Sequence, residues 1–508
     1  MHHPHTAPRS LDPHATAARS PVREVRHPNS VTAPPVHRGS MPALPWQGFW
    51  KSVARALTGR TPGVEGAEPA APAQPWQAAA QRRRWTFVLL VLCSTVLASV
   101  LFAQVQPAYE SAWLGWGQIA LFALLSAWVV SGFMTGMMGF WVMLRGDKHS
   151  LSARSVAGHA LSPEARTAII MPICNEDVAT VFAGLRATCE SVAATGHGQT
   201  FDVFVLSDSY DSDIARAERA AWEDLRMALA ANPQQPQVQV QVYYRLRKRR
   251  THRKAGNVAD FCRRWGKDYR YMVVLDADSV MSGDCIVSMA KLMEANPTAG
   301  IIQTATQAIG HVTLHARAQQ FASRVTGRLF TLGMQFWQLG ESHYWGHNAI
   351  IRVEPFMQHC ALAPIPGKGG LAGGIMSHDF VEAALMRRAG YHVWLVADLV
   401  GSYEQQPPDL RAELQRDRRW CQGNLQNARL MAEPGIHPVH RSMFVTGAMA
   451  YLSAPLWLAF MTLGTALWVS GAPVLTDWHI LPTELLALWA WTLSMLFLPR
   501  VLGVLAVF

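Results

Sequence analysis

The sequence predicts an α/β domain with a mostly parallel β-sheet, inserted between transmembrane α-helices. Long apolar runs lie near both ends of the chain, strand and helix patterns alternate between them, and polar clusters directly follow the strands. Half of the 508 residues are hydrophobic and only 16% are charged, which excludes a disordered chain and a coiled-coil rod. The seven cysteines include no C-x-x-C pair, which argues against a disulfide scaffold and a thiolate zinc site.

Residues 1–80 are predicted to form a disordered, basic, proline-rich tail. Residues 1–84 contain 13 of the 30 prolines and eleven Lys or Arg against four Asp or Glu. Such a segment buries too little apolar surface to offset the entropy of the chain. Within it, Trp46 to Leu57 has two interpretations: a short amphipathic helix on an anionic membrane surface, or part of a solvated tail. The composition favours the tail.

Two transmembrane helices are predicted in residues 81–145 and two more in residues 431–508. Each region holds two apolar runs close to the ~20 residues that cross a bilayer. The runs cover 85–103, 118–144, 443–469 and 485–508. Basic residues precede the first run, follow the second and precede the third, which places the segment between the second and third runs in the cytoplasm. The fourth run reaches Phe508, so we expect the native protein to continue beyond it.

The segment 146–430 is predicted to be the α/β domain. Runs rich in apolar residues predict strands at 167–172, 201–207, 238–244, 271–276 and 301–305, and helical patterns follow from about 177, 212, 255 and 283. This alternation implies a mostly parallel sheet with helices on both faces. Ligands of such sheets bind at the carboxyl ends of the strands, so the polar residues there are the candidate site.

Carboxylates follow two of these strands. Asp276 and Asp278, in LDADS, can together bind one hard divalent cation with substrate phosphates, and a solvated turn is the alternative. Asp208 can accept hydrogen bonds from a nucleobase or ribose, or it can cap the next helix. Lys254 begins a helix pattern within reach of a diphosphate. It ends a basic run over 245–254 that otherwise predicts a surface loop rather than a nucleic-acid site.

Two further clusters lie nearer the third apolar run. Asp379, in SHD, opens a helix pattern after the glycine-rich stretch 367–374. It can act as a general base for a hydroxyl nucleophile or as a helix cap. Arg416, Arg419 and Trp420 lie in RDRRWCQGN. Arginine suits a pyrophosphate and tryptophan suits a sugar ring, whereas an anchor at the membrane interface is the alternative.

Taken in order, these residues resemble the signature of the processive family 2 glycosyltransferases, the group that contains cellulose and hyaluronan synthases. That family uses an Asp for the nucleoside, a D-x-D for metal and diphosphate, a T-E-D-type base, and Q-x-x-R-W near the membrane. HNAIIR over 347–352 resembles its acceptor segment. In sequence, the segments of this chain are most similar to the branch that makes osmoregulated periplasmic glucans: MPICNED, KAGN, LDADS, GGIMSHDF and RDRRWCQGN. The match covers roughly residues 85–508.

The resemblance implies a nucleotide-diphospho-sugar transferase-like (GT-A) domain in a multi-pass protein of the bacterial inner membrane, with its catalytic domain in the cytoplasm. It implies inverting transfer of glucose from UDP-glucose to a growing β-glucan acceptor, with Mg²⁺ or Mn²⁺ as cofactor. Membrane lipids and periplasmic glucan-processing proteins are the implied partners. The implied roles are Asp379 as base; Asp276 and Asp278 for the metal; Asp208, Lys254, Asp276, Asp278 and Arg419 for the donor; and His347, Asn348, Arg416 and Trp420 for the acceptor.

Two positions depart from the family pattern. Arg416 stands where the motif has Gln, and His378 stands where T-E-D has its acidic residue, which leaves open how the acceptor is held. A cellulose-like or chitin-like synthase is an alternative function. A membrane transporter or sensor with a nucleotide-binding domain is a further one. It is disfavoured because the first two apolar runs carry no charge and the acidic residues gather in the central segment.

Overall fold

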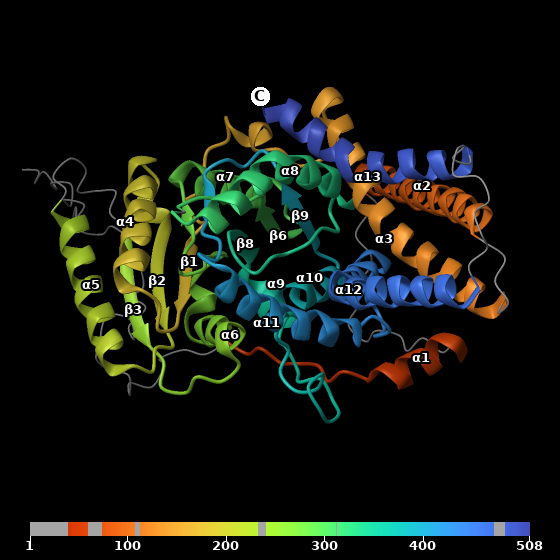
Figure 1. The fold of residues 1–508 in the computed structure, drawn as a ribbon. Helices are drawn as coiled ribbons and strands as arrows, with labels where there is room; N and C mark the ends of the chain where they lie inside the picture. The colour runs from red at the N-terminus through yellow and green to blue at the C-terminus, as the bar shows by residue number, and fades with distance from the viewer. Residues whose placement is uncertain are drawn as a thin grey trace, which may run out of the picture.

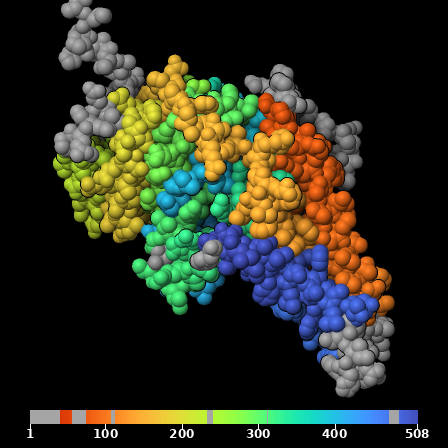
Figure 2. Space-filling view, turned by 90° about the horizontal axis from the view of Figure 1, so that it is seen from above, coloured from red at the N-terminus to blue at the C-terminus, as the bar shows by residue number. Residues whose placement is uncertain are grey.

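The computed structural model describes residues 39–58, 74–106, 112–231, 240–310, 312–471 and 483–507. An α/β domain forms one end of the molecule and long helices form the other, as Figures 1 and 2 show. Among the described residues, four helices are long and apolar enough to cross a membrane. They are α2 (Pro75–Val105), α3 (Ala112–Arg145), α12 (Pro438–Gly471) and α13 (Thr483–Val507). Each contains one of the four apolar runs, and with them the chain is membrane-associated.

A seven-stranded sheet in the order β3-β2-β1-β4-β8-β6-β9 is the frame of the α/β domain. Its strands are β1 (Thr167–Ile173), β2 (Phe201–Ser207), β3 (Gln241–Leu246), β4 (Tyr271–Val274), β6 (Ala299–Thr304), β8 (Ala349–Arg352) and β9 (His392–Val396). All neighbours are parallel except β8, which is antiparallel to both β4 and β6. A small second sheet pairs β10 (Ser402–Glu404) with β5 (Val280–Met281) and β7 (Gln307–Ala308).

Helices cover both faces of the large sheet (Figure 1). One face packs against α4 (Val178–Ala194), α5 (Ser212–Ala230) and α7 (Gly283–Ala295). The other packs against α6 (Arg253–Trp265), α9 (Val353–His359) and α10 (His378–Arg388). Successive strand residues alternate between the two cores: Ile169 lies in the first and Ile170 in the second, and both are fully buried. Because both faces are buried, the strands read as nearly continuous apolar runs.

The predicted class, a mostly parallel α/β domain inserted between apolar helices, is confirmed. The strands predicted at 167–172, 201–207, 271–276 and 301–305 are β1, β2, β4 and β6, and β3 begins three residues later than predicted. The antiparallel strand β8 was not predicted, because its four residues are too few to show a period. The helices α8 (Leu314–Gln338) and α11 (Leu410–Ala428) were not predicted either.

Helix α8 lies directly against the membrane helix α3. A Cβ atom on Gly139 of α3 would lie 1.8 Å from the carbonyl oxygen of Leu329, and one on Gly333 would lie 1.9 Å from that of Thr135. The two backbones therefore touch, and only glycine fits at both positions. This contact joins the α/β domain to the membrane helices.

Residues 39–58 differ from the predicted disordered tail. The indole of Trp46 is buried and donates to the carbonyl of Ala363 (2.8 Å), and Glu433 accepts from the amides of Gln47 (3.2 Å) and Gly48 (3.0 Å). Helix α1 (Phe49–Thr58) follows. Tertiary contacts with distant residues order this part, which composition does not reveal. Residues 75–80 of the predicted tail also differ from the prediction, because they form the start of α2 with Trp76 and Ala80 buried. Residues 1–38 and 59–73 lie outside the described residues.

Candidate active site

The carboxyl ends of β1, β2 and β4 form one edge of the sheet, and two of the predicted site segments begin there. The amide of Asp208 donates to the carbonyl of Ile173 (2.8 Å), and the amide of Leu275 donates to that of Ile170 (2.9 Å). Both bonds are to β1, which lies between β2 and β4. Since neighbouring strands are about 4.8 Å apart, Asp208 and Asp276 begin loops about 10 Å apart.

Lys254 connects the Asp276 carboxylate to a second loop. Its ammonium group contacts Oδ1 of Asp276 and donates to the carbonyl of Gly346 (2.7 Å). Burial raises the pKa of Asp276, but the positive charges of Lys254 and His347 outweigh that effect and the pKa lies below its ordinary value. Asp276 is therefore ionised at neutral pH.

Asp278 lies on the same turn with its side chain accessible. Partial desolvation and the negative charge of Asp276 raise the pKa of Asp278 to about 6. The turn thus presents one carboxylate already paired with an ammonium group and a second that has a raised pKa. A bound cation would remove the repulsion between these two carboxylates.

Asp379 lies on the other side of Gly346, in the first turn of α10. A Cβ atom at Gly346, where φ is +86°, would lie 3.6 Å from Oδ2 of Asp379. Gly346 thus accepts a hydrogen bond from Lys254 and lies beside Asp379, so the predicted base is close to the D-x-D turn. Burial is the main cause that raises the pKa of Asp379; His378 lowers it and Glu382 raises it further.

His378 occupies the position of the missing acidic residue of the motif. Its Nδ1 lies 3.1 Å from Oε2 of Glu382, one turn further along α10, and both side chains are largely buried. Burial lowers the pKa of His378, but the Glu382 carboxylate outweighs burial and the pKa is raised. Glu382 therefore favours the protonated form of the His378 imidazole beside Asp379.

Asp208 is held by an arginine that the sequence reading assigned to a surface loop. Arg247 donates to both Asp208 oxygens, from Nε (2.7 Å) and Nη2 (2.6 Å), and both side chains are buried. The basic run 245–254 is therefore only partly a surface loop. The position of Arg247 could have predicted this pairing, because Arg247 directly follows β3 and so lies at the same edge of the sheet as Asp208.

Glu218 is a second residue that the sequence reading missed. It lies on α5, is 1% exposed, and accepts hydrogen bonds from Ser207 (2.7 Å), Ser209 (2.5 Å) and the hydroxyl of Tyr244 (2.9 Å). These residues flank Asp208. A buried carboxylate with three donors fixes the loop after β2. No local motif marks Glu218, because its partners are brought to it by the sheet.

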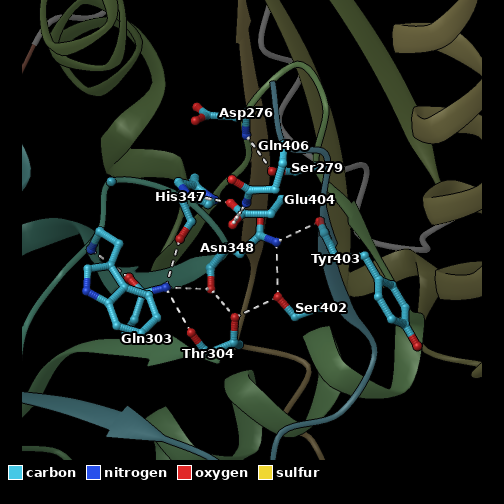
Figure 3. A network of polar contacts seen from close by, with 12 residues as sticks. Asp276, Ser279, Gln303, Thr304, His347, Asn348, Ser402, Tyr403, Glu404 and Gln406 are labelled. Carbon is cyan, nitrogen blue, oxygen red and sulfur yellow. Dashed lines mark hydrogen bonds and ion pairs between the residues drawn. The ribbon is translucent and has the colours of Figure 1, made fainter. Parts of the chain in front are cut away.

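A chain of polar contacts connects His347 to Arg416, and Figure 3 shows the part of it around Glu404. Nε2 of His347 lies 3.2 Å from Oε2 of Glu404, and Gln406 donates to Oε1 of Glu404 (2.9 Å). Arg416 donates to Gln406 (3.0 Å), and its guanidinium group lies 4.5 Å from the ring centre of Trp420, which is 48% exposed. Glu404 and Gln406, which were not predicted, thus connect the predicted residues His347 and Arg416.

The other predicted residues are placed differently. Asn348 is fully buried, and its amide donates to Ser402 (3.0 Å) and to the carbonyl of Tyr403 (3.1 Å), which fastens the small sheet (Figure 3). Arg419 is exposed, and its charge lowers the pKa of Glu176, which burial and Asp276 raise more strongly. The charges of Arg419 and Asp276 therefore both affect the pKa of Glu176.

Two family profiles match parts of this chain. The profile of "Glycosyl transferase family 2" matches residues 168–360, and that of "Glycosyl transferase family group 2" matches residues 271–505. Each covers part of the strand-end edge described above. These two matches confirm the resemblance to family 2 glycosyltransferases that the motifs show.

The chain is also similar to proteins named glucans biosynthesis glucosyltransferase H. It is 51% identical to the protein of Ralstonia nicotianae over 97% of this chain and 59% of that protein. It is 50% identical to the protein of Salmonella typhimurium over 93% of this chain and 60% of that protein. The chain spans about 60% of the length of these curated relatives.

A mannosyltransferase of Pyrobaculum calidifontis, PcManGT, solved with GDP-Man and Mn²⁺, is similar at 17% identity and a TM-score of 0.43. The similarity covers 76% of this chain and 95% of that one.

Proposed function

We propose that the chain belongs to an inverting glucosyltransferase of the bacterial inner membrane. The enzyme transfers glucose from UDP-glucose to the growing β-glucan backbone of osmoregulated periplasmic glucans. The observation that carries this proposal is that Lys254 contacts Asp276 and the carbonyl of Gly346, and that Gly346 lies beside Asp379. It joins a donor-type carboxylate turn to a carboxylate suited to act as a base. The similarity to glucosyltransferase H supports glucose as the sugar.

In the proposed reaction, the acceptor hydroxyl oxygen attacks the anomeric carbon of the donor. The new O–C bond forms as the bond from that carbon to the diphosphate oxygen breaks, UDP leaves with the bonding electron pair, and Asp379 receives the hydroxyl proton. The raised pKa of Asp379 makes it a stronger base than an ordinary aspartate. Attack from the side opposite UDP inverts the anomeric centre and yields a β-linkage from an α-linked donor.

The donor lies along the strand ends in this proposal. The Asp208 carboxylate, oriented by Arg247, accepts hydrogen bonds from the uridine. Lys254 and Arg419 place positive charge beside the diphosphate, and a flexible, exposed arginine suits its oxygens.

The residues at the D-x-D turn fit Mg²⁺ or Mn²⁺. Two carboxylates, Asp276 and Asp278, share the turn, and among the described parts of the chain no group of three or more His, Cys, Asp or Glu is placed to hold a metal by itself. Mg²⁺ typically takes one or two carboxylates and completes its shell with substrate phosphates and water. When bound, the ion supplies positive charge against the leaving diphosphate.

The acceptor end is proposed to lie between Trp420 and Asp379. The exposed Trp420 offers a flat face for a sugar ring, Arg416 and His347 line the approach through their polar chain, and Asn348 keeps that loop in place. The membrane helices then form the path by which the glucan leaves the cytoplasmic side. Lipids surround this path, and glucan-processing proteins receive the product in the periplasm.

Membranes that carry the full-length protein, incubated with labelled UDP-glucose and Mg²⁺, test the proposal by linkage analysis of the labelled product. We expect a β-glucan that differs in linkage from cellulose and whose formation stops with EDTA and returns with Mg²⁺. Unlabelled UDP-N-acetylglucosamine or GDP-mannose should not compete. A cellulose-like or chitin-like polymer, or transfer that ignores the metal, contradicts the proposal.

A further inference from the structure

We propose that Glu341 is a positioning residue that couples the membrane helices to the catalytic-base helix, so that transfer to the glucan depends on it more than hydrolysis of the donor does, in which water takes the glucosyl group and UDP leaves. The inference rests on the proposed function. Glu341 lies in the turn between α8 and β8 and is 3% exposed. No motif of the family includes it, and it touches none of the residues assigned to the donor.

Three segments bring a basic side chain to this one carboxylate. Arg387 of α10 donates from Nε (3.2 Å) and Nη2 (3.0 Å) to Oε1, and Nε2 of His437 lies 3.1 Å from the same oxygen. Arg84 of α2 contacts Oε2. Burial lowers the pKa of His437 to about 4, so this imidazole is neutral at pH 7 and the two guanidinium groups supply the charge.

On the catalytic side, two short segments connect Glu341 to the site, one along the chain and one along α10. Gly346, which accepts a hydrogen bond from Lys254 and lies beside Asp379, follows Glu341 by five residues. Arg387 and Asp379 lie on the same helix, eight residues or about 12 Å apart. A displacement of Glu341 therefore moves both the glycine loop and the helix that carries the base.

On the membrane side, the contacts of α2 extend around Glu341. Arg84 also donates to the carbonyls of Trp337 (3.0 Å) and Gln338 (2.6 Å), and Arg83 donates to that of Phe336 (2.8 Å). These are last-turn carbonyls of α8, which have no partner within the helix. Arg83 also pairs with both oxygens of Asp147, just beyond α3 (2.8 and 2.7 Å).

The remaining membrane contact comes from α12. His437 immediately precedes its first residue, Pro438. Arg84 of α2 and His437, just before α12, thus meet at one carboxylate, and the Arg83–Asp147 pair connects the end of α3 to α2 beside it. A positive flank at the cytoplasmic side of a membrane helix would not require these contacts. The geometry makes Glu341 the point at which the orientation of the membrane helices reaches the base.

Glu341→Gln in the full-length protein tests this coupling, because it keeps the shape and an acceptor oxygen but removes the charge that holds two guanidinium groups. We expect the KM for UDP-glucose to stay within about twofold, while the glucose incorporated per UDP released falls at least about tenfold. Arg82→Gln is the matched control: it removes a charge two residues from Arg84 on an exposed position of α2, and the ratio should stay at the wild-type value.

A second pair of variants covers a failure of Glu341→Gln to fold. Arg387→Lys keeps a positive charge, and Arg387→Gln does not; the incorporation ratio should be closer to wild type in the lysine variant. A parallel fall of UDP release and incorporation in all of these variants would show a purely structural cluster and overturn the coupling. If the wild-type protein releases no UDP from UDP-glucose, the proposed function itself is wrong and the coupling falls with it.

Discussion

The proposed donor half and the proposed acceptor half of the site are held in place by different means. In the donor half, Asp208 and Asp276 directly follow parallel strands, and backbone hydrogen bonds of the sheet fix where they begin. In the acceptor half, Asp379, His347 and Arg416 come from a helix, a turn and a second helix. Buried or partly buried side chains such as Glu341, Glu404 and Gln406 connect them.

The difference teaches where each half is vulnerable. A residue placed by sheet register keeps its position when a neighbouring side chain changes, whereas a residue placed by a polar chain loses its position when one member is removed. Substitutions in the donor half should therefore change affinity for the donor. Substitutions in the acceptor half should change transfer.

Asp379→Asn is expected to have the largest effect and to separate the halves most cleanly. It removes the base while keeping size and hydrogen bonding, so glucan synthesis should fall by about 10²–10⁴-fold. Binding of UDP-glucose, measured by equilibrium titration, should be unchanged because the donor half is intact. Near-normal turnover would refute the role of the base, and loss of donor binding would show that the halves are not separable.

Asp278→Ala tests the donor half. Loss of a charged ligand worth about 1.5–3 kcal/mol should weaken UDP binding about 10–150-fold in the presence of Mg²⁺ and have little effect in EDTA. Titration calorimetry with and without the metal measures both values. Asp284→Ala, an exposed carboxylate at the start of α7, is the control and should bind UDP normally. An equal loss in both buffers would remove the metal assignment.

Glu218→Gln asks whether the loop after β2 depends on side chains as well as on register. The charged acceptor of three buried hydroxyls is lost, which should cost about 1–3 kcal/mol of unfolding free energy and raise the KM for the donor. Thermal unfolding and steady-state kinetics measure the two effects. Glu223→Gln, exposed on the same helix, should change neither. A stable variant with an unaltered KM would show that register alone places Asp208.

His378→Gln is expected to have the smallest effect, a shift in pH dependence. Only the ionised form of Asp379 accepts a proton, so activity is present above its raised pKa and is lost as pH falls through it. The charge of His378 lowers that pKa, so its removal should move the acid limb of the transfer rate to higher pH. His159→Gln, at an exposed position, should leave the profile in place. A shift to lower pH would contradict the assigned role of His378.

The features that the sequence predicted correctly lie mainly in the donor half of the site. Strands β1, β2 and β4 and the carboxylates after them were predictable because apolar runs and strand-end residues are local signals. Strand β8 was not, because it is too short to show a period. Helix α8 was missed although its amphipathic pattern is a local signal. Arg247, Glu218 and Glu341 act on partners from distant segments, and no local pattern reports such pairs. The charge runs around Arg84 and Arg247 were seen but interpreted as solvated or interfacial.

The backbone contact between α8 and α3 affects how this protein can be purified. Cutting the chain at residues 146 and 430 would yield a soluble fragment only if α8 had a polar outer surface. Instead, Gly333 meets Thr135 with no side chain between them, and Gly503 of α13 lies similarly close to Val325. An excised fragment would expose to water the face of α8 that packs against α3 and α13, and it would aggregate. Purification in detergent or nanodiscs with the membrane helices attached is therefore the suitable route.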